Sequence, residues 1–382
     1  MKQMLICSLL FCFACAPLPP ATQPSTPIAV TQIFTATTES TATSVSAPTE
    51  DYAIFSINVQ DFSHPAESAA LLNHILDLHE ETRVPVDIYL TDVMARIYAE
   101  QFPALLERLR TSPVVAVSYH DRAPRPYVND YDWLGLGDMS SQQQYETVMR
   151  YETHAVDPVT GQTTDDPGGY QYVADLIGYP PYAASSLTSG TLDQAVTRVF
   201  RELGAHLTVV HGRATDLGEK KDGLYIRPEH FDYMLFQHAG EDAAASFESA
   251  LEQARSSGGQ SPFFVGVKMH DNDFFATKSA WTTVYVNGGK HPDWDPTLSA
   301  PLLSPAEQDA MWMIYEQTVR YIASQQNRVT PVNLPMILQM ITQSALHDNA
   351  PGGFPGTARQ GKCAIHRWDA GLQIQQSIPL SI

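Results

Sequence analysis

From Tyr52 onward, short apolar runs alternate along the chain with segments whose apolar residues recur at every third or fourth position. A nearly continuous apolar run predicts a strand buried on both faces, and spacing of three and four predicts an amphipathic helix. The expected strands are residues 52–59, 84–91, 113–119, 206–210, 232–236 and 263–269. The expected helices are residues 65–81, 93–110 with a break at Pro103, 140–151, 190–205 and 304–324, the last opening on a Ser304–Glu307 capping box.

The alternation of strands and helices indicates a parallel sheet covered on both faces. Because the units extend over roughly 300 residues, they predict one parallel β/α barrel, which commonly reaches this size. No G-x-G-x-x-G or P-loop accompanies the strands, so the usual signatures of nucleotide-binding folds are absent. We place the barrel at residues 51–347 and expect an irregular tail at residues 348–382. Residues 121–189 carry one expected helix and otherwise predict loops over one face.

The N-terminus is typical of a secretory signal: Lys2 precedes an apolar stretch that ends at Ala14. The stretch is shorter than the ~20 residues that a membrane-spanning helix needs. Cys15 follows Ala14 as in a bacterial lipoprotein cleavage site, so we expect residues 1–15 to be a signal and Cys15 to carry a lipid anchor. Ordinary cleavage after Ala16 is the alternative. Residues 16–50 are rich in Thr, Ser and Pro and predict a flexible stalk that holds the domain outside the cytoplasm.

The charge of the chain argues against nucleic-acid binding, and its cysteine content argues against a disulfide or a cysteine metal cluster in the domain. The chain has 382 residues and a formal net charge of −19 with no basic run, whereas nucleic-acid binding needs a cationic footprint. Of the four cysteines only Cys363 lies beyond the signal, so a disulfide within the domain and a cysteine metal cluster are both excluded.

Polar side chains gather where the expected strands end, and in a β/α barrel these ends meet at one mouth. Imidazole and carboxylate groups at one mouth suit a divalent cation such as Zn²⁺, which can activate a bound water. The alternative is that such residues cap helices and loops, which we expect of Asp92 and consider for His64; His211 and His238 stay open between the two. The residues at these ends are Gln60, Asp61, His64, Asp92, His120, Asp121, Arg122, Arg125, His211, Arg213, Asp216, His238, His270, Asp271 and Asp273.

The order of these elements resembles the polysaccharide deacetylase (NodB homology) superfamily over roughly residues 52–345. The resemblance rests on "FSINVQD" at the first strand, "VPVDIYLT" at the second, "VAVSYH" at the third, "ELGAH" before a further strand and "VGVKMH" at a late strand. It implies a distorted β/α barrel that holds a divalent metal, often zinc, and removes acetyl groups from polysaccharides. By this resemblance Asp61 and His120 would bind the metal, and His270 would protonate the leaving group.

The sequence departs from the family pattern at two positions. Gln60 stands where the family has the aspartate that serves as base, and an amide cannot accept that proton. Pro124 stands where the second metal histidine is expected. Asp271 and Asp273 are the catalytic candidates that accompany His270, and Asp121 or His64 are further replacements.

We therefore expect an extracytoplasmic, metal-dependent hydrolase that deacetylates a cell-surface or environmental polysaccharide. Loop residues Arg122, Arg125, Trp281 and Trp294 are expected to contact the sugar, although a tryptophan can equally cover the end of a barrel. One alternative is a catalytically inactive glycan-binding lipoprotein of the same fold, and another is a glycoside hydrolase that pairs Asp61 with Asp271 or Asp273. A solute-binding lipoprotein would predict two lobes, and no composition break near the midpoint supports it.

Overall fold

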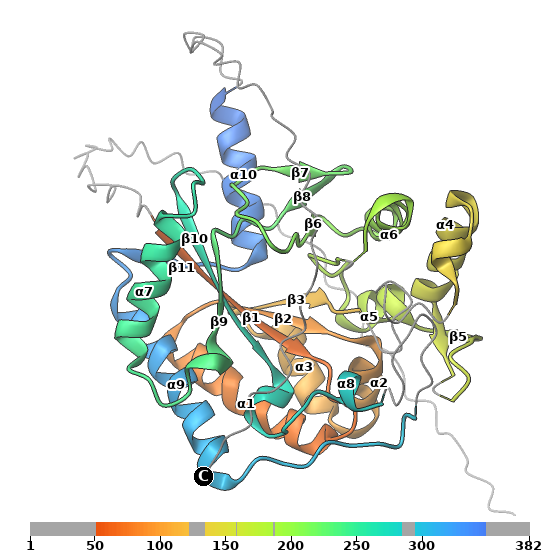
Figure 1. The fold of residues 1–382 in the computed structure, drawn as a ribbon, viewed down its shortest axis with the longest axis horizontal. Helices are drawn as coiled ribbons and strands as arrows, with labels where there is room; N and C mark the ends of the chain where they lie inside the picture. The colour runs from red at the N-terminus through yellow and green to blue at the C-terminus, as the bar shows by residue number, and fades with distance from the viewer. Residues whose placement is uncertain (1–50, 122–133, 158, 186–187, 285–294, 349–382) are drawn as a thin grey trace, which may run out of the picture. The chain divides into compact units, whose positions relative to one another are not determined.

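The computed structural model describes residues 51–121, 134–157, 159–185, 188–284 and 295–348, which belong to one compact unit (Figure 1). The predicted signal, Cys15, the stalk, Arg122, Arg125, Trp294 and the tail beyond residue 348 lie outside these ranges. Within them, every helix is too short or too polar to span a lipid bilayer.

A parallel sheet forms the centre of the domain, with strand order β3-β2-β1-β10-β9. A short further strand, β11, pairs with the first three residues of β1. This arrangement confirms the predicted α/β fold with a parallel sheet. The strands are β1 (Asp51–Val59), β2 (Val86–Leu90), β3 (Val115–Tyr119), β9 (Phe231–Met234), β10 (Phe263–His270) and β11 (Val329–Pro331).

Backbone hydrogen bonds continue the sheet beyond β3. The Tyr119 amide donates to the Ala183 carbonyl at 2.8 Å, and Ala183 forms a parallel bridge with Leu207 in β6. β6 (Leu207–Thr208) pairs with β8 (Leu224–Ile226), which also pairs with β7 (Lys220–Lys221). No ladder joins β8 to β9 among the described residues, so the strand pairings there do not show a closed barrel.

The helices surround this sheet and agree with most of the predicted segments. The break at Pro103 separates α2 from α3, and α9 opens with the Ser304–Glu307 capping box. The remaining described elements are the hairpin β4 (His154–Val156) and β5 (Thr163–Pro167) and three 3-10 turns: η2 (Leu136–Asp138), η3 (Leu235–His238) and η4 (Asp271–Phe274). The helices are α1 (Pro65–Thr82), α2 (Asp92–Gln101), α3 (Pro103–Thr111), α4 (Ser141–Thr153), α5 (Gly169–Ile177), α6 (Gly190–Glu202), α7 (Ala243–Arg255), α8 (Ala280–Val284), α9 (Pro305–Ser324) and α10 (Leu334–Asp348).

The prediction of a single helix within residues 121–189 was wrong, because α5 is a second one. Its N-terminal Gly168 and Gly169 read as a loop signal, yet its apolar face is buried. Tyr170 packs edge-on against Tyr119 at the end of β3, with 5.5 Å between ring centroids. Tertiary packing therefore stabilises a short helix that local propensity does not predict.

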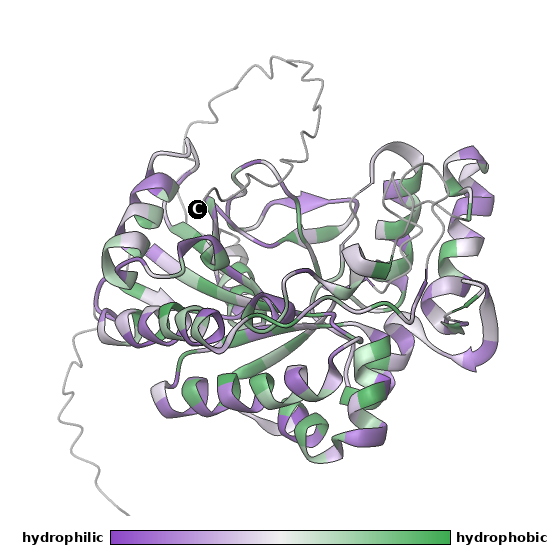
Figure 2. Cartoon of the chain, turned by 60° about the horizontal axis from the view of Figure 1, so that its bottom comes forward, coloured by the Kyte–Doolittle hydropathy of each residue, from purple (hydrophilic) through white to green (hydrophobic). Residues whose placement is uncertain are grey.

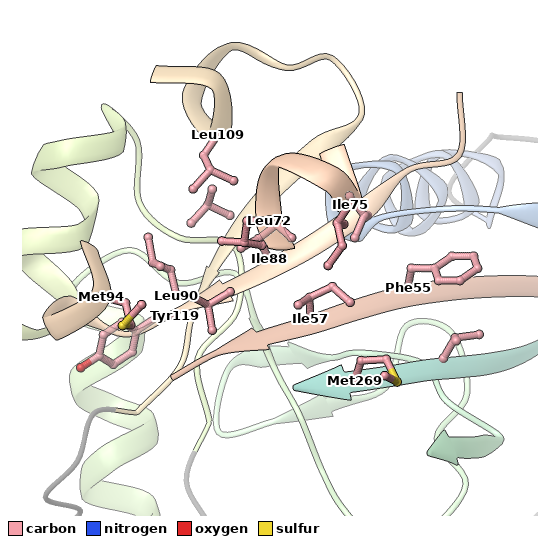
Figure 3. Packing of buried hydrophobic residues seen from close by; sticks show 14 of the residues in the cluster. Phe55, Ile57, Leu72, Ile75, Ile88, Leu90, Met94, Leu109, Tyr119 and Met269 are labelled. Carbon is pink, nitrogen blue, oxygen red and sulfur yellow. The ribbon is translucent and has the colours of Figure 1, made fainter. Parts of the chain in front are cut away.

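The two faces of the sheet differ in composition. On one face, Phe55 and Ile57 of β1 pack with Leu72 and Ile75 of α1 in the main hydrophobic core (Figure 3). In Figure 2 the strands of the main sheet are mostly hydrophobic, and the helices around them alternate between hydrophobic and hydrophilic turns. The opposite face begins apolar, with Ile54 in a second core cluster, but then changes to polar residues along the strands. The strands are largely buried, as predicted, but in their C-terminal halves one face carries polar side chains.

Candidate functional site

A cavity of about 330 Å³ lies on the polar face of the sheet. Successive residues of a strand point to opposite faces, so every second residue of β1 and β10 reaches the cavity while its neighbours reach the core. The parallel register places Ser56 beside Lys268, and Asn58 beside both His270 and Tyr89. The cavity is lined by Ser56, Asn58, Gln60, Tyr89, Tyr119, His120, Asp121, Ser185, Val209, His211, Arg227, Lys268, His270, Ser279 and Thr282.

His270 ends β10 and is held by a carboxylate on its own chain segment. Its Nδ1 lies 2.9 Å from Oδ2 of Asp273, which also accepts a hydrogen bond from the His270 backbone amide at 2.7 Å. Asn272 donates to the other oxygen of Asp273 at 3.2 Å, so the carboxylate is itself fixed. This carboxylate–imidazole pair leaves Nε2 as the ring nitrogen that can exchange a proton with a ligand.

His120 and His211 line the same cavity from the segments that follow β3 and β6, as sequence reasoning expected of the first and left open for the second. The Nδ1 of His120 lies 2.8 Å from the backbone carbonyl of Asp121. Because a carbonyl only accepts, Nδ1 carries the proton, and the lone pair of the neutral ring is on Nε2. Three imidazoles from distant parts of the sequence therefore meet in one cavity.

Asp61 does not join them, although the resemblance gave it the central metal role. It is fully buried and absent from the cavity lining. Its Oδ1 accepts hydrogen bonds from the backbone amides of Ser63 and His64 at 3.0 and 3.2 Å and from the Ser63 hydroxyl at 2.6 Å. Asp61 thus fixes the turn into α1, and His64 takes part in that turn.

Asp271 is also fully buried behind the cavity. Its two oxygens accept four hydrogen bonds: from the amides of Gln60 and Asp61 at 3.2 Å each, from Asn272 at 2.9 Å and from the Ser68 hydroxyl at 2.6 Å. Burial raises the pKa of Asp271 to about 6, and the nearby Asp61 charge adds to the rise while the Ser68 bond opposes it. Asp271 joins the ends of β10 and β1 to α1, so the predicted pairing of Asp61 with Asp271 around a substrate is not formed.

The donor set does not fit the implied metal as the side chains are placed. Among the residues that the structure describes, no three His, Cys, Asp or Glu side chains gather closely enough to hold an ion. Asp61 points into its own turn and His120 into the cavity. We therefore derive no chemical step through a metal.

The remaining candidates fall elsewhere. His238 lies in a separate pocket, where its Nδ1 is 2.8 Å from Glu241 and 3.1 Å from the Ser246 hydroxyl. A nucleophilic triad needs the acid and the serine on different ring nitrogens, so these three residues do not form one. As expected, Asp92 serves structure, accepting the Gly169 amide at 2.8 Å. Trp281 lies in α8, and its side chain is outside the described part of the chain.

The other two strand-end candidates also bond to neighbouring side chains. Arg213 pairs with Glu219 at 2.9 Å on the surface. Asp216 accepts from the buried His230 ring at 2.9 Å. Neither residue lines the cavity.

Sequence reasoning missed the residues that lie deeper than the strand ends. Asn58, Tyr89, Lys268 and Arg227 line the cavity, but none is at the end of an expected strand. The signal was present as alternation: in "FSINV" and "VKMH" polar residues occupy every second position of otherwise apolar runs. A period of two in a central strand indicates that one face meets a polar interior.

Buried charges support the floor of the cavity. The guanidinium of Arg227 forms an ion pair with Glu229 and donates to the Ser56 hydroxyl at 2.8 Å. Against the effect of burial, the Glu229 carboxylate raises the pKa of Arg227, and burial raises the pKa of Glu229 itself. The Tyr89 hydroxyl and the Arg227 Nε both lack a hydrogen bond of normal geometry to described residues.

Asp87 lies on the same face of β2, where its Oδ1 accepts the Leu334 amide at 3.1 Å. Burial raises its pKa to about 8, so the native state holds a proton there that the unfolded chain releases near its ordinary pKa of 3.8. Because its carboxyl pKa is raised, the contribution of Asp87 to stability is greatest below about pH 4 and falls as the pH rises toward 8.

We therefore expect Asp87→Asn to flatten the loss of stability between pH 4 and 8, because asparagine keeps the acceptor and does not titrate. The free energies of unfolding of the two proteins should diverge by on the order of a few kcal/mol at the alkaline end. Urea denaturation across this range measures the effect, with the exposed Asp166→Asn as the matched control. Equal slopes for wild type and Asp87→Asn would show that Asp87 does not hold the proton.

Comparison with known proteins finds solved structures that are similar only at low identity and at TM-scores below 0.5. No protein-family model and no curated protein matches the sequence. A putative polysaccharide deacetylase from Mycobacterium smegmatis is 11% identical, with a TM-score of 0.45 over 82% of this chain and 96% of that one. A family 4 carbohydrate esterase from Streptomyces lividans is 12% identical, with a TM-score of 0.33 over 74% of this chain and 92% of that one.

The 4-alpha-glucanotransferase from Thermococcus litoralis is 12% identical, with a TM-score of 0.44, and this chain covers 76% of its own length but only 40% of that enzyme. Polysaccharide or peptidoglycan deacetylases recur among the similar structures. We therefore infer the function from the residues that line the cavity.

Proposed function

We propose that this protein is a carbohydrate-active hydrolase that removes an acyl group from a glycan, with His270 as the acid–base group. One observation carries the proposal: His270, oriented by Asp273, shares a polar cavity with His120 and His211. An imidazole held by a carboxylate is the usual device for moving a proton during attack on a carbonyl.

The chemistry follows from the positions of the cavity residues. His270 Nε2 takes a proton from the water that attacks the acyl carbonyl, and it returns this proton to the departing amine or alkoxide when the bond to the acyl carbon breaks. Asp273 on Nδ1 keeps the ring in place through this exchange. Asn58, which neighbours His270 on the same face, can donate to the oxyanion that develops on the carbonyl. Gln60 lines the cavity as an amide and cannot act as the base.

The lining also favours a sugar as the substrate. Amide and hydroxyl groups of Asn58, Gln60, Ser56 and Ser185 offer both donors and acceptors for sugar hydroxyls, and the Tyr89 and Tyr119 rings bring apolar surface. The predicted signal and the predicted lipid anchor at Cys15 would hold the domain outside the cytoplasm. We therefore propose that the substrate is a glycan of the cell surface or its surroundings.

The zinc site stays a prediction, and metal analysis tests it. Zinc bound in one-to-one ratio to the purified chain, and lost in both Asp61→Ala and His120→Ala, would confirm the site implied by the resemblance. From the placement of Asp61 we expect Asp61→Ala to lower stability through the turn into α1 and to leave metal content unchanged.

Release of acetate from acetylated glycan oligomers by the purified chain tests the hydrolase. The second candidate is a glycan-binding protein without catalysis, favoured by the amide at Gln60 and by the exclusion of Asp61 from the cavity. Binding of the oligomers with no acetate release would establish that candidate in place of the enzyme.

A further inference from the structure

The cavity carries a charge that its acyl-transfer role does not use. Lys268 and Arg227 line it together with three histidines, while Asp121 is the only carboxylate in the lining among described residues. The two cations, Lys268 and Arg227, lie together in a chain whose formal net charge is −19. Buried cations are costly unless something pairs with them, so their presence in a cavity calls for an explanation.

The two cations differ in how closely a carboxylate pairs with them. Glu229 pairs closely with Arg227, whereas the nearest acid to the Lys268 ammonium is Asp232 at 3.6 Å, the outer part of the range for an ion pair. Asp87, also on this face, has its pKa raised by burial to about 8 and is mostly neutral at pH 7. Of the two cations in the lining, Lys268 is therefore the one whose ammonium is less closely paired.

Hydrogen-bond donors in the lining also favour a ligand that carries acceptor oxygens. Arg227 is 5% exposed and its Nε has no hydrogen bond of normal geometry, and the buried Tyr89 hydroxyl lacks one as well. The side chain of Lys268 is 20% exposed, and Lys268 pairs in register with Ser56, two residues before His270 on the same face. An ammonium donates three hydrogen bonds and accepts none, so its partner must be an acceptor.

We propose that the cavity selects an acidic sugar, whose anionic group lies against Lys268 within the field of Arg227 while the acyl group lies at His270. The anionic group is a carboxylate or a sulfate ester, which share the negative oxygens that an ammonium binds. This inference rests on the proposed function for the acyl group, but the recognition of charge does not depend on hydrolysis.

Binding to the full chain by calorimetry tests the inference with three oligosaccharide probes of equal length: one of hexuronic acid units, one sulfated and one neutral. We expect an anionic probe to bind about tenfold or more tightly than the neutral one, as one charge-assisted hydrogen bond supports. The better of the two anionic probes identifies the group. Equal or weaker binding of both, or binding of none, would overturn the inference.

Variants locate the anion site. Lys268→Gln should reduce the preference for the anionic probe about tenfold and leave neutral binding within about twofold, and Lys268→Arg should restore it. Lys221→Gln is the control, since Lys221 of β7 pairs with Asp193 of α6 and lies outside the cavity lining. An unchanged preference in Lys268→Gln would refute the role of this lysine. Acetate release from neutral glycans alone would contradict the charge preference and leave the hydrolase intact, so the two proposals fail separately.

Discussion

His270→Gln should lower the rate of acyl release by about 10² to 10⁴-fold, the usual contribution of a positioned acid–base group. Glutamine keeps a similar volume and can hydrogen-bond Asp273, but it cannot transfer a proton at neutral pH. The loss should be in kcat, with glycan binding close to wild type. Acetate release under saturating substrate, with binding measured separately, checks this result.

Two variants separate chemistry from structure in this experiment. Asp273→Asn keeps the backbone contact to His270 and removes the charge beside its ring, so we expect an intermediate loss of rate and a changed pH profile. His238→Gln, in the separate pocket beside Glu241, should have no effect on rate. If His270→Gln released acetate as fast as wild type, His270 would not be the acid–base group.

Arg227→Met should destabilise the fold by about 3–5 kcal/mol, because it leaves Glu229 buried without its partner. Glu229 has little room to move, since a β-carbon on Gly266 of β10 would already overlap its carboxylate. Replacing both members, Arg227→Met with Glu229→Leu, should recover much of this loss, because no unpaired charge then remains. The urea midpoints of the single and double variants measure the difference.

The surface pair Arg150–Asp165 provides the control, since both side chains are largely exposed and Arg150→Met should change stability little. A double variant as unstable as Arg227→Met alone would mean that the guanidinium stabilises through its bond to Ser56 and not by balancing Glu229.

The long helices and the polar residues at the strand ends could be predicted from the sequence. The cavity residues that lie within the strands, before their ends, could not. Helices α1 and α9 carry their own apolar spacing and start signals, so both were predicted nearly to the residue. His120 and His270 follow apolar runs directly, and parallel strands bring such ends to one place.

What was missed depends on contacts between distant segments. Asp61 and Asp271 look like site residues because they adjoin strand ends, yet backbone amides and Ser68 draw both carboxylates inward. Arg227 and Glu229 lie far from β1 in sequence and reach it only through the arrangement of β8. Helix α5 is stabilised by the packing of Tyr170 against Tyr119, and no local sequence pattern predicts this contact.

The central strands of this domain assign two tasks to neighbouring positions. In β1, Phe55 and Ile57 belong to the hydrophobic core, and Ser56 and Asn58, which alternate with them, line the cavity. Substitutions at the second set can accumulate while the first set keeps the scaffold folded, since each set contacts a different side of the sheet. The substrate specificity of this protein can thus change in evolution through substitutions at the cavity-facing positions, while the core-facing positions keep the fold unchanged.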